Sequence, residues 1–141
     1  MPKFYIPQST KQLVANRADG RCEYCQCPAD FSTELFSIEH ILPRSKEGLN
    51  DVENLAFSCS GCNIFKSDKT AFLDNISQQL QPLFHPRTMS WSEHFIWDDT
   101  LTVIIGKTAV GRVTIEALKL NRRQIKNLRR ALIAIGEHPP K

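Results

Sequence analysis

The sequence predicts an α+β fold with a small cysteine-stapled core and an appended lobe, and three observations support this. Two C-x-x-C pairs, Cys22 with Cys25 and Cys59 with Cys62, flank a stretch patterned as strand, loop and strand. A helical pattern begins at the second pair, and the last third of the chain combines a hairpin pattern with two amphipathic helices. At 141 residues the chain suits one core with a lobe, which we expect at residues 1–70 and 71–141.

The elements of the first part follow from capping and alternation patterns. Ser9 to Gln12 has the form of a capping box, and Asp19-Gly20 gives the helix a stop. Phe36 and Ile38 alternate with polar neighbours, while Pro43 cannot continue a central strand. The expected order is a helix from Ser9 to about Ala18, a strand ending near Ile41, a loop over 46–51, a return strand over 55–57 and a helix from Asn63 to about Ser67.

The elements of the second part are predicted from spacing and turn residues. Apolar residues over 72–80 have helical spacing, and Pro82 and Pro86 end that pattern. Segments 95–97 and 101–105 resemble the two strands of a hairpin. Thr108 is placed to cap a helix to about Lys119. A last helix follows the capping-box spacing of 121–124, with Gly136 as its stop. Together these elements predict a C-terminal extension made of a β-hairpin and basic helices.

The four paired cysteines predict a structural zinc site. Two C-x-x-C turns supply the four sulfur ligands that Zn²⁺ takes in tetrahedral geometry. In a reducing compartment such pairs favour a metal over disulfides. The fifth cysteine, Cys27, is expected to be a free thiol, although an alternative ligand role stays open. Because no apolar run approaches a membrane span and no signal-peptide pattern begins the chain, we expect a cytoplasmic protein.

Basic residues gather near the end of the chain. The formal net charge is only +3, but residues 107–141 hold nine Lys or Arg against two Glu. Such a block favours a polyanionic partner. A solvated helix face is the alternative explanation of the same block.

A set of ordered motifs covers about residues 17–70: Arg21-Cys22-Glu23-Tyr24-Cys25, Glu39-His40-Ile41-Leu42-Pro43-Arg44-Ser45, Gly48, Asn50-Asp51, Asn54-Leu55-Ala56, Cys59 and Cys62-Asn63-Ile64-Phe65-Lys66. On these residues the sequence resembles the HNH endonucleases, in their small stand-alone bacterial form. The resemblance implies the ββα-metal fold, also called the His-Me finger, with a four-cysteine zinc site. It also implies cleavage of DNA with the help of a divalent ion.

The resemblance implies roles for particular residues. His40 would be the general base that takes a proton from the attacking water, which suits a neutral imidazole. Glu39 and Asn63 would hold one catalytic ion, Mg²⁺ or Mn²⁺, since both offer oxygen ligands. Asn54 would brace the loop that aims His40. The expected nucleic-acid contacts are Lys66, Arg44, Arg122, Arg123, Arg129 and Arg130.

Two departures from the family pattern affect these roles. The third signature position is Asn63 instead of histidine, and Glu39 stands where Asp is also common. Neighbouring residues on a strand point to opposite faces, so Glu39 and His40 share a site only if the strand ends or bulges there. His40 as a core histidine is the alternative to a catalytic role. The other histidines, His85, His94 and His138, are expected to be packing, surface or tail residues.

The sequence leaves three functions to compare. The first is a metal-dependent DNA endonuclease with zinc as scaffold. The second is a non-catalytic, zinc-stabilised nucleic-acid-binding module, which would need no general base beside metal ligands. The third is a protein-interaction adaptor. A steep fall of DNA affinity with rising salt concentration would distinguish the first two functions from it.

Overall fold

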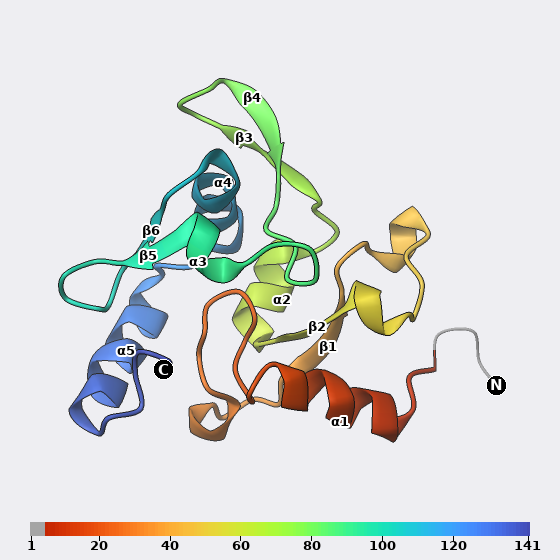
Figure 1. The fold of residues 1–141 in the computed structure, drawn as a ribbon, viewed down its shortest axis with the longest axis horizontal. Coiled ribbons are helices and arrows are strands. Elements are labelled where there is room, and N and C mark those ends of the chain that lie inside the picture. Colours follow the sequence, from red (N-terminus) through yellow and green to blue (C-terminus); the bar gives the residue numbers. More distant parts are fainter. Residues whose placement is uncertain (1–4) are drawn as a thin grey trace. The chain divides into compact units, whose positions relative to one another are not determined.

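A two-stranded antiparallel sheet and a helix fill the segment between and after the cysteine pairs in the computed structural model, which describes residues 5–141. Strand β1 (Ser37–His40) pairs with β2 (Leu55–Ser58), and α2 (Ser60–Lys66) follows β2 directly (Figure 1). The register sets Glu39 opposite Ala56 and His40 opposite Leu55. The order strand, loop, strand, helix is the one that the sequence predicts.

Helix α1 (Gln8–Arg17) precedes the first cysteine pair. Its N-cap is Pro7, which makes no side-chain cap bond, so the predicted capping box at Ser9 is wrong and Ser9 lies inside the helix. Proline is tolerated at this N-cap because it has no backbone N–H that would need a partner, and its fixed φ fits the extended conformation found there. At the other end, the Arg17 guanidinium donates to the carbonyls of Val52 and Leu55, at 2.6 and 2.5 Å. The helix is thereby tied to the start of β2.

The chain divides into two compact units by its contacts. One unit contains the residues up to Thr70 together with His85–Thr88, and the other contains Ala71–Phe84 and Met89–Lys141. The predicted domains differ from these units by the short segment His85–Thr88. In the first unit the buried apolar residues are few and include all four paired cysteines: Val14, Cys22, Tyr24, Cys25, Ile41, Leu55, Ala56, Cys59 and Cys62. So small a core is the kind that a metal staple supports.

The second unit begins with a hairpin where a helix was predicted. Strand β3 (Ala71–Asp74) pairs with β4 (Gln79–Pro82), so the predicted helix over 72–80 is wrong. A turn forms between them because the Asp74 carboxylate accepts from the backbone N–H of Ser77, and Gln78 adopts a positive φ of 61°. The short apolar run is compatible with the periodicity of a helix and with that of a strand. The turn residues between the two halves of the run favour the hairpin.

The remaining elements of the second unit follow the predicted order, except for one short helix before the hairpin that the sequence did not predict. Helix α3 (Trp91–His94) leads into β5 (Phe95–Trp97), which pairs with β6 (Ile104–Gly106) as the hairpin pattern predicted. Thr108 caps α4 (Ala109–Leu118), its hydroxyl accepting from Gly111 N–H at 3.1 Å.

The final helix, α5 (Arg123–Ala134), starts later than its predicted capping box. Its N-cap is Arg122, so the cap role predicted for Asn121 is wrong. The Asn121 amide instead bonds both backbone groups of Ile104, at 2.7 and 2.8 Å, and holds the start of β6.

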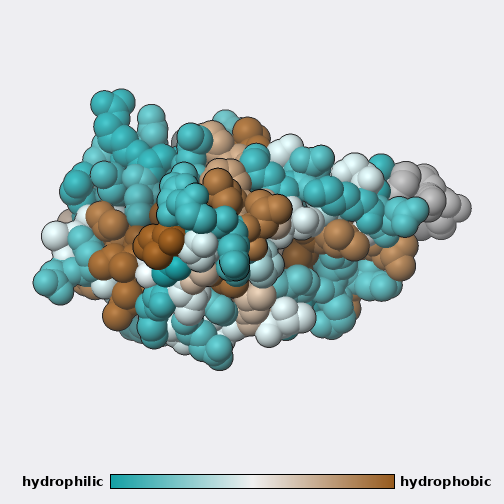
Figure 2. Space-filling model, turned by 90° about the horizontal axis from the view of Figure 1, so that it is seen from above, coloured by the Kyte–Doolittle hydropathy of each residue, from teal (hydrophilic) through white to brown (hydrophobic). Residues whose placement is uncertain are grey.

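Surface and membrane properties give no further assignment. On the face drawn in Figure 2, hydrophobic side chains reach the surface in several places among hydrophilic ones. Scattered exposed apolar residues are normal on proteins, and we assign them no role. Among the helices that lie between residues 5 and 141, none has the length and apolar character needed to cross a bilayer. The cytoplasmic location stays a prediction.

Candidate active site and metal centre

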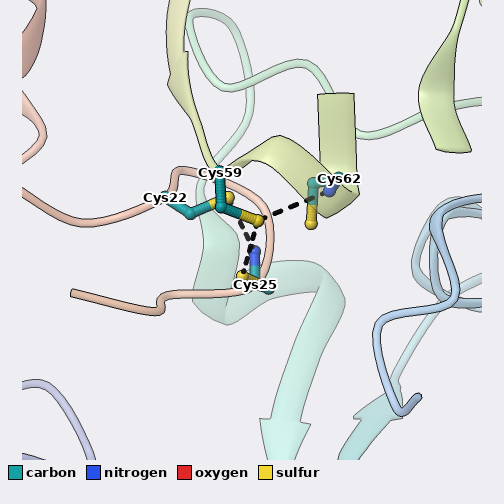
Figure 3. A group of neighbouring side chains, drawn as sticks. All are labelled: Cys22, Cys25, Cys59 and Cys62. Atoms are coloured by element: carbon teal, nitrogen blue, oxygen red, sulfur yellow. Dashed lines mark hydrogen bonds between the residues drawn. The ribbon is translucent and has the colours of Figure 1, made fainter. Parts of the chain in front are cut away.

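The four paired cysteines form one buried cluster. Their Sγ atoms all lie within 4.8 Å of one another, and the side chains point toward a common centre (Figure 3). Cys25 Sγ and Cys59 Sγ are 3.7 Å apart. Four sulfurs around Zn²⁺ at about 2.3 Å would be about 3.8 Å apart, so this spacing fits the ion. The cluster could therefore hold a metal ion, and its chemistry suits zinc.

The backbone around the cluster already points hydrogen-bond donors at the sulfurs. Cys25 N–H donates to Cys22 Sγ at 3.5 Å, and Cys62 N–H donates to Cys59 Sγ at 3.4 Å. Burial raises the pKa of Cys22 and of Cys25, whereas hydrogen bonding from Cys22 lowers the pKa of Cys59. Without a metal, the buried cluster disfavours four negative charges at once. A divalent cation would stabilise all four cysteines as thiolates.

The two residues inside the first cysteine pair connect the cluster to the sheet. Glu23 N–H donates to the Phe57 carbonyl at 2.9 Å, and the Glu23 carboxylate accepts from Phe57 N–H at 2.8 Å and pairs with Arg87. Tyr24 is fully buried, and its hydroxyl donates to Glu39 Oε1 at 2.5 Å. The turn of the first cysteine pair is therefore bonded to β2 through Glu23 and to β1 through Tyr24.

Cys27 lies outside the cluster. It is partly exposed, and its Sγ lies 3.8 Å from the carbonyl of Pro28. The set of residues that could hold a metal contains the other four cysteines and not Cys27. This agrees with the predicted free thiol.

Asn54 and Gly48 shape the loop between β1 and β2. The Asn54 side chain accepts from Leu42 N–H at 2.8 Å and donates to the carbonyls of Leu42 and Leu49, at 3.1 and 2.9 Å. Gly48 packs so closely that a Cβ there would lie 1.7 Å from the Leu42 carbonyl oxygen. A side chain at position 48 would force the loop open. These contacts give Asn54 the geometry of a brace for the segment that follows His40.

A chain of three groups fixes the state of the His40 ring. The Tyr5 carbonyl can only accept a hydrogen bond, so the Asn50 amide nitrogen faces it, at 3.2 Å. The Asn50 amide oxygen therefore faces His40 Nε2, at 2.7 Å. Because that oxygen can only accept, Nε2 carries the proton of the neutral ring. The lone pair is then on Nδ1, the atom able to take a proton.

Glu39 and Lys66 form a buried ion pair on the other face of β1. Lys66 Nζ lies 3.0 Å from Glu39 Oε2 and donates to the carbonyls of His40 and Ile41, at 3.3 and 3.0 Å. Burial raises the pKa of Glu39, and the charge of Lys66 and the hydroxyl of Tyr24 offset part of this effect. Lys66 is 1% exposed, so we assign it no phosphate contact, contrary to the sequence expectation.

Glu39 does not fit a divalent ion as it is arranged. Both Glu39 oxygens are engaged, and its charge is balanced by a lysine ammonium. An ion bound to Glu39 would have to displace Lys66 from a set of three oxygen atoms. Asn63 Nδ2 lies 3.4 Å from Ser37 Oγ, on the face of β1 that carries Glu39. Strand alternation thus places the Glu39 side chain on the face of β1 opposite the His40 ring, the difficulty that the sequence raised.

His40 lines an open cleft of about 550 Å³ in the first unit. Two basic side chains reach this cleft, the predicted Arg44 and the unpredicted Lys11 of α1. Lys11 precedes the signature motifs, so no pattern in the sequence pointed to it. The lining residues are Tyr5, Ile6, Lys11, Phe36, Ser37, Ile38, His40 and Arg44.

The four arginines predicted to contact nucleic acid in the second unit differ in exposure. Arg123 and Arg130 are exposed, and Arg122 is half-buried with its guanidinium donating to the carbonyls of Leu118 and Lys119.

Arg129 is different because it is only 2% exposed. Its guanidinium donates to the carbonyls of Thr102 and Leu120, at 2.8 and 2.7 Å, and stacks over Trp97. We therefore assign Arg129 no phosphate contact and treat it as a packing residue.

Comparison with known proteins identifies the family of the segment that holds the cysteine pairs. Residues 22–69 match the sequence model of the HNH endonuclease family, so this segment is an HNH domain, and the predicted resemblance is confirmed. The chain is also similar to the Septu protein PtuB of Bacillus thuringiensis, with 25% identity over 114 residues. That alignment covers 79% of this chain and 41% of PtuB, so the chain spans about two fifths of its relative's length. No solved structure gives a significant match.

Proposed function

We propose that this protein is a metal-dependent DNA endonuclease that hydrolyses phosphodiester bonds, with His40 as general base and the four-cysteine cluster as a structural zinc site. The HNH match over residues 22–69 supports nuclease chemistry at the level of the family. The fold that we propose for the core is the ββα-metal fold of that family, built from β1, β2 and α2.

The arrangement of His40 is the observation that supports this function most strongly. Its Nε2–H donates to Asn50, which leaves Nδ1 to accept a proton from water. In the proposed step Nδ1 takes that proton as the water oxygen bonds to phosphorus, and the bond between phosphorus and the 3′ oxygen breaks. Lys11 and Arg44 line the same cleft and would attract the phosphate.

The proposal keeps a catalytic metal ion, but Glu39 is no longer proposed as its ligand. The family resemblance implies Mg²⁺ or Mn²⁺, whose chemistry would be to stabilise charge on the phosphate. Because Glu39 is held by Tyr24 and Lys66, no step of the proposed reaction depends on an ion bound to Glu39. Asn63 remains a proposed oxygen ligand.

The second candidate is a zinc-stabilised module that binds nucleic acid without cutting it. The burial of Glu39 favours this candidate, because an expected ligand of the catalytic ion is instead paired with Lys66. Against it stands His40, whose hydrogen bonding is arranged for one defined tautomer in an open cleft. A pure binder has no need of that arrangement.

Cleavage of supercoiled plasmid DNA separates the two candidates. The purified protein is incubated with Mg²⁺, with Mn²⁺ and with chelator, beside His40→Ala. The proposal predicts metal-dependent nicking or linearisation by the wild type and none by the variant, with equal zinc content in both. Salt-sensitive DNA binding without cleavage under either metal would favour the binding module.

A further inference from the structure

We propose that the cleft beside His40 receives an unpaired nucleotide, so that the preferred substrate is DNA with single-stranded character at the scissile position. This inference rests on the proposed nuclease function and names its substrate class. It follows from the chemistry of the side chains that line the cleft.

The cleft combines positive charge with aromatic and aliphatic surface. Lys11 and Arg44 supply the charge, and among the described residues that line the cleft none is acidic. Tyr5 and Phe36 supply rings, and Ile6 and Ile38 supply aliphatic surface. A nucleotide presents the matching groups, a phosphate and a flat base. Basic grooves that carry aromatic platforms are the usual form of single-strand binding sites.

The size of the cleft also suits a nucleotide. Its volume of about 550 Å³ lies within the range of small-molecule sites. A ligand of this size would lie beside His40 and Ser37, which are lining residues on β1. The phosphate joined to the bound nucleotide would then be next to the proposed general base.

Phe36 is the residue best prepared to stack on a base. Its ring packs against Phe57, with centroids 5.0 Å apart and planes tilted by 45°. This contact restricts the ring before any ligand arrives, while the side chain remains partly exposed. Phe57 belongs to β2, so the platform is part of the sheet that carries His40. Because the Phe36 ring is already restricted, stacking of a base on it would cost the protein little further side-chain entropy.

An intact duplex cannot use this surface. Bases in B-DNA are stacked on their neighbours, and only their edges are accessible from the grooves. Contact with the face of Phe36 requires a base that is extruded or already unpaired. Recognition of intact duplex by phosphate contacts alone is therefore the competing outcome.

Binding measured without cleavage tests this inference. Fluorescence anisotropy in chelator compares a fluorescein-labelled DNA strand, the same strand in full duplex, and a duplex with one mispaired nucleotide. We expect the single strand to bind at least about fivefold more tightly than the duplex, and the mispaired duplex to lie between them.

Two matched pairs of variants locate the effect in the cleft. Phe36→Leu should lose about fivefold or more of its single-strand affinity and keep its duplex affinity, while Phe31→Leu, an exposed phenylalanine outside the cleft, should change neither. Lys11→Gln should weaken single-strand binding more than Lys69→Gln does. Equal affinity for the single strand and the duplex would overturn the inference. So would equal effects of the two phenylalanine variants, with folding verified by circular dichroism.

The outcome for the nuclease function is read separately. The same three DNAs are incubated with Mg²⁺ or Mn²⁺ and examined for cleavage. Strand binding that depends on Phe36 without cleavage would support the cleft and contradict the nuclease. Cleavage of fully paired duplex at the rate of single strand would support the nuclease and overturn the substrate preference. Absence of binding to all three DNAs would overturn both.

Discussion

The ammonium of Lys66 lies 3.0 Å from a carboxylate oxygen of Glu39, and their side chains are 2% and 3% exposed. Lys66 is on α2 and Glu39 on β1, so the pair joins the helix to the strand that ends in His40. The same ammonium bonds the carbonyls of His40 and Ile41. The pair therefore fixes the backbone from which the proposed general base projects.

The Glu39–Lys66 pair predicts strong coupling between two substitutions. Glu39→Gln or Lys66→Met alone leaves one charge buried without its partner, and each should lower the free energy of unfolding by about 3–5 kcal/mol. The double variant buries neither charge, so its loss should be clearly smaller than the sum of the two. Denaturant unfolding of all four proteins gives the coupling energy. Additive losses would show that the two side chains do not interact.

The same double variant also tests whether Glu39 binds the catalytic ion. If Glu39 is a positioning residue, the double variant should cleave DNA with the metal dependence of the wild type. A large rise in the Mg²⁺ or Mn²⁺ concentration needed for cleavage, in a protein that remains folded, would restore Glu39 as a ligand.

Asn50 is predicted to position His40. Asn50→Ala removes the acceptor of His40 Nε2–H, and the cleavage rate should fall by about 10-fold or more, with little change in KM. Asn50→Asp keeps an acceptor and should retain more activity than Asn50→Ala. Nitrogen NMR of the His40 ring should show Nε2–H in the wild type and a mixture of tautomers in Asn50→Ala.

A matched control for Asn50 is Asn127→Ala. The Asn127 amide oxygen accepts from the exposed Arg130, at 2.6 Å. Its loss should change neither the rate nor the spectrum. If Asn50→Ala cleaves as fast as the control, Asn50 has no part in the reaction.

The cysteines predict different results for two serine substitutions. Cys62→Ser removes a ligand of the buried cluster, so the protein should lose bound zinc and a large part of its stability. Cys27→Ser should keep one zinc ion per chain and unfold as the wild type does, because Cys27 lies outside the cluster. Metal analysis by mass spectrometry and thermal unfolding measure both effects. Zinc loss in Cys27→Ser would assign that thiol to the site.

Acid should weaken the second unit through Asp74. Two hydrogen bonds from Arg112, both 3.0 Å, hold the pKa of Asp74 below its usual range. A lowered carboxyl pKa stabilises the fold at pH values above the ordinary Asp pKa of about 4, and that contribution is lost as pH falls further. Asp74→Asn should thus lower the unfolding midpoint at neutral pH and have less effect in acid. An effect independent of pH would contradict this role.

The signature residues were predictable because their patterns are local. C-x-x-C spacing located the cluster, and Thr108 predicted the start of α4. The segment over 72–80 failed because its few apolar residues fit a helix and a strand equally. The Asp74 turn then decided between them.

Other features depend on contacts that sequence patterns do not encode. The sequence predicts phosphate contacts for Lys66, from its place one helical turn after Asn63, and for Arg129, from the basic last helix. Both side chains are buried and bonded to backbone carbonyls. Lys11 joins the cleft only because α1 folds against the sheet of β1 and β2, through its contacts with β2. A charge pattern says that a residue is basic and not which way its side chain points.

Single-turnover cleavage by His40→Ala tests the central claim most directly. A defined DNA strand is incubated with excess protein and Mg²⁺ or Mn²⁺, and His94→Ala is the control, because that ring bonds Thr108 in the second unit. The account predicts a loss of about 10²-fold or more for His40→Ala and none for His94→Ala. Equal rates for His40→Ala and the wild type, with zinc content and folding unchanged, would contradict the assignment of His40 as the general base.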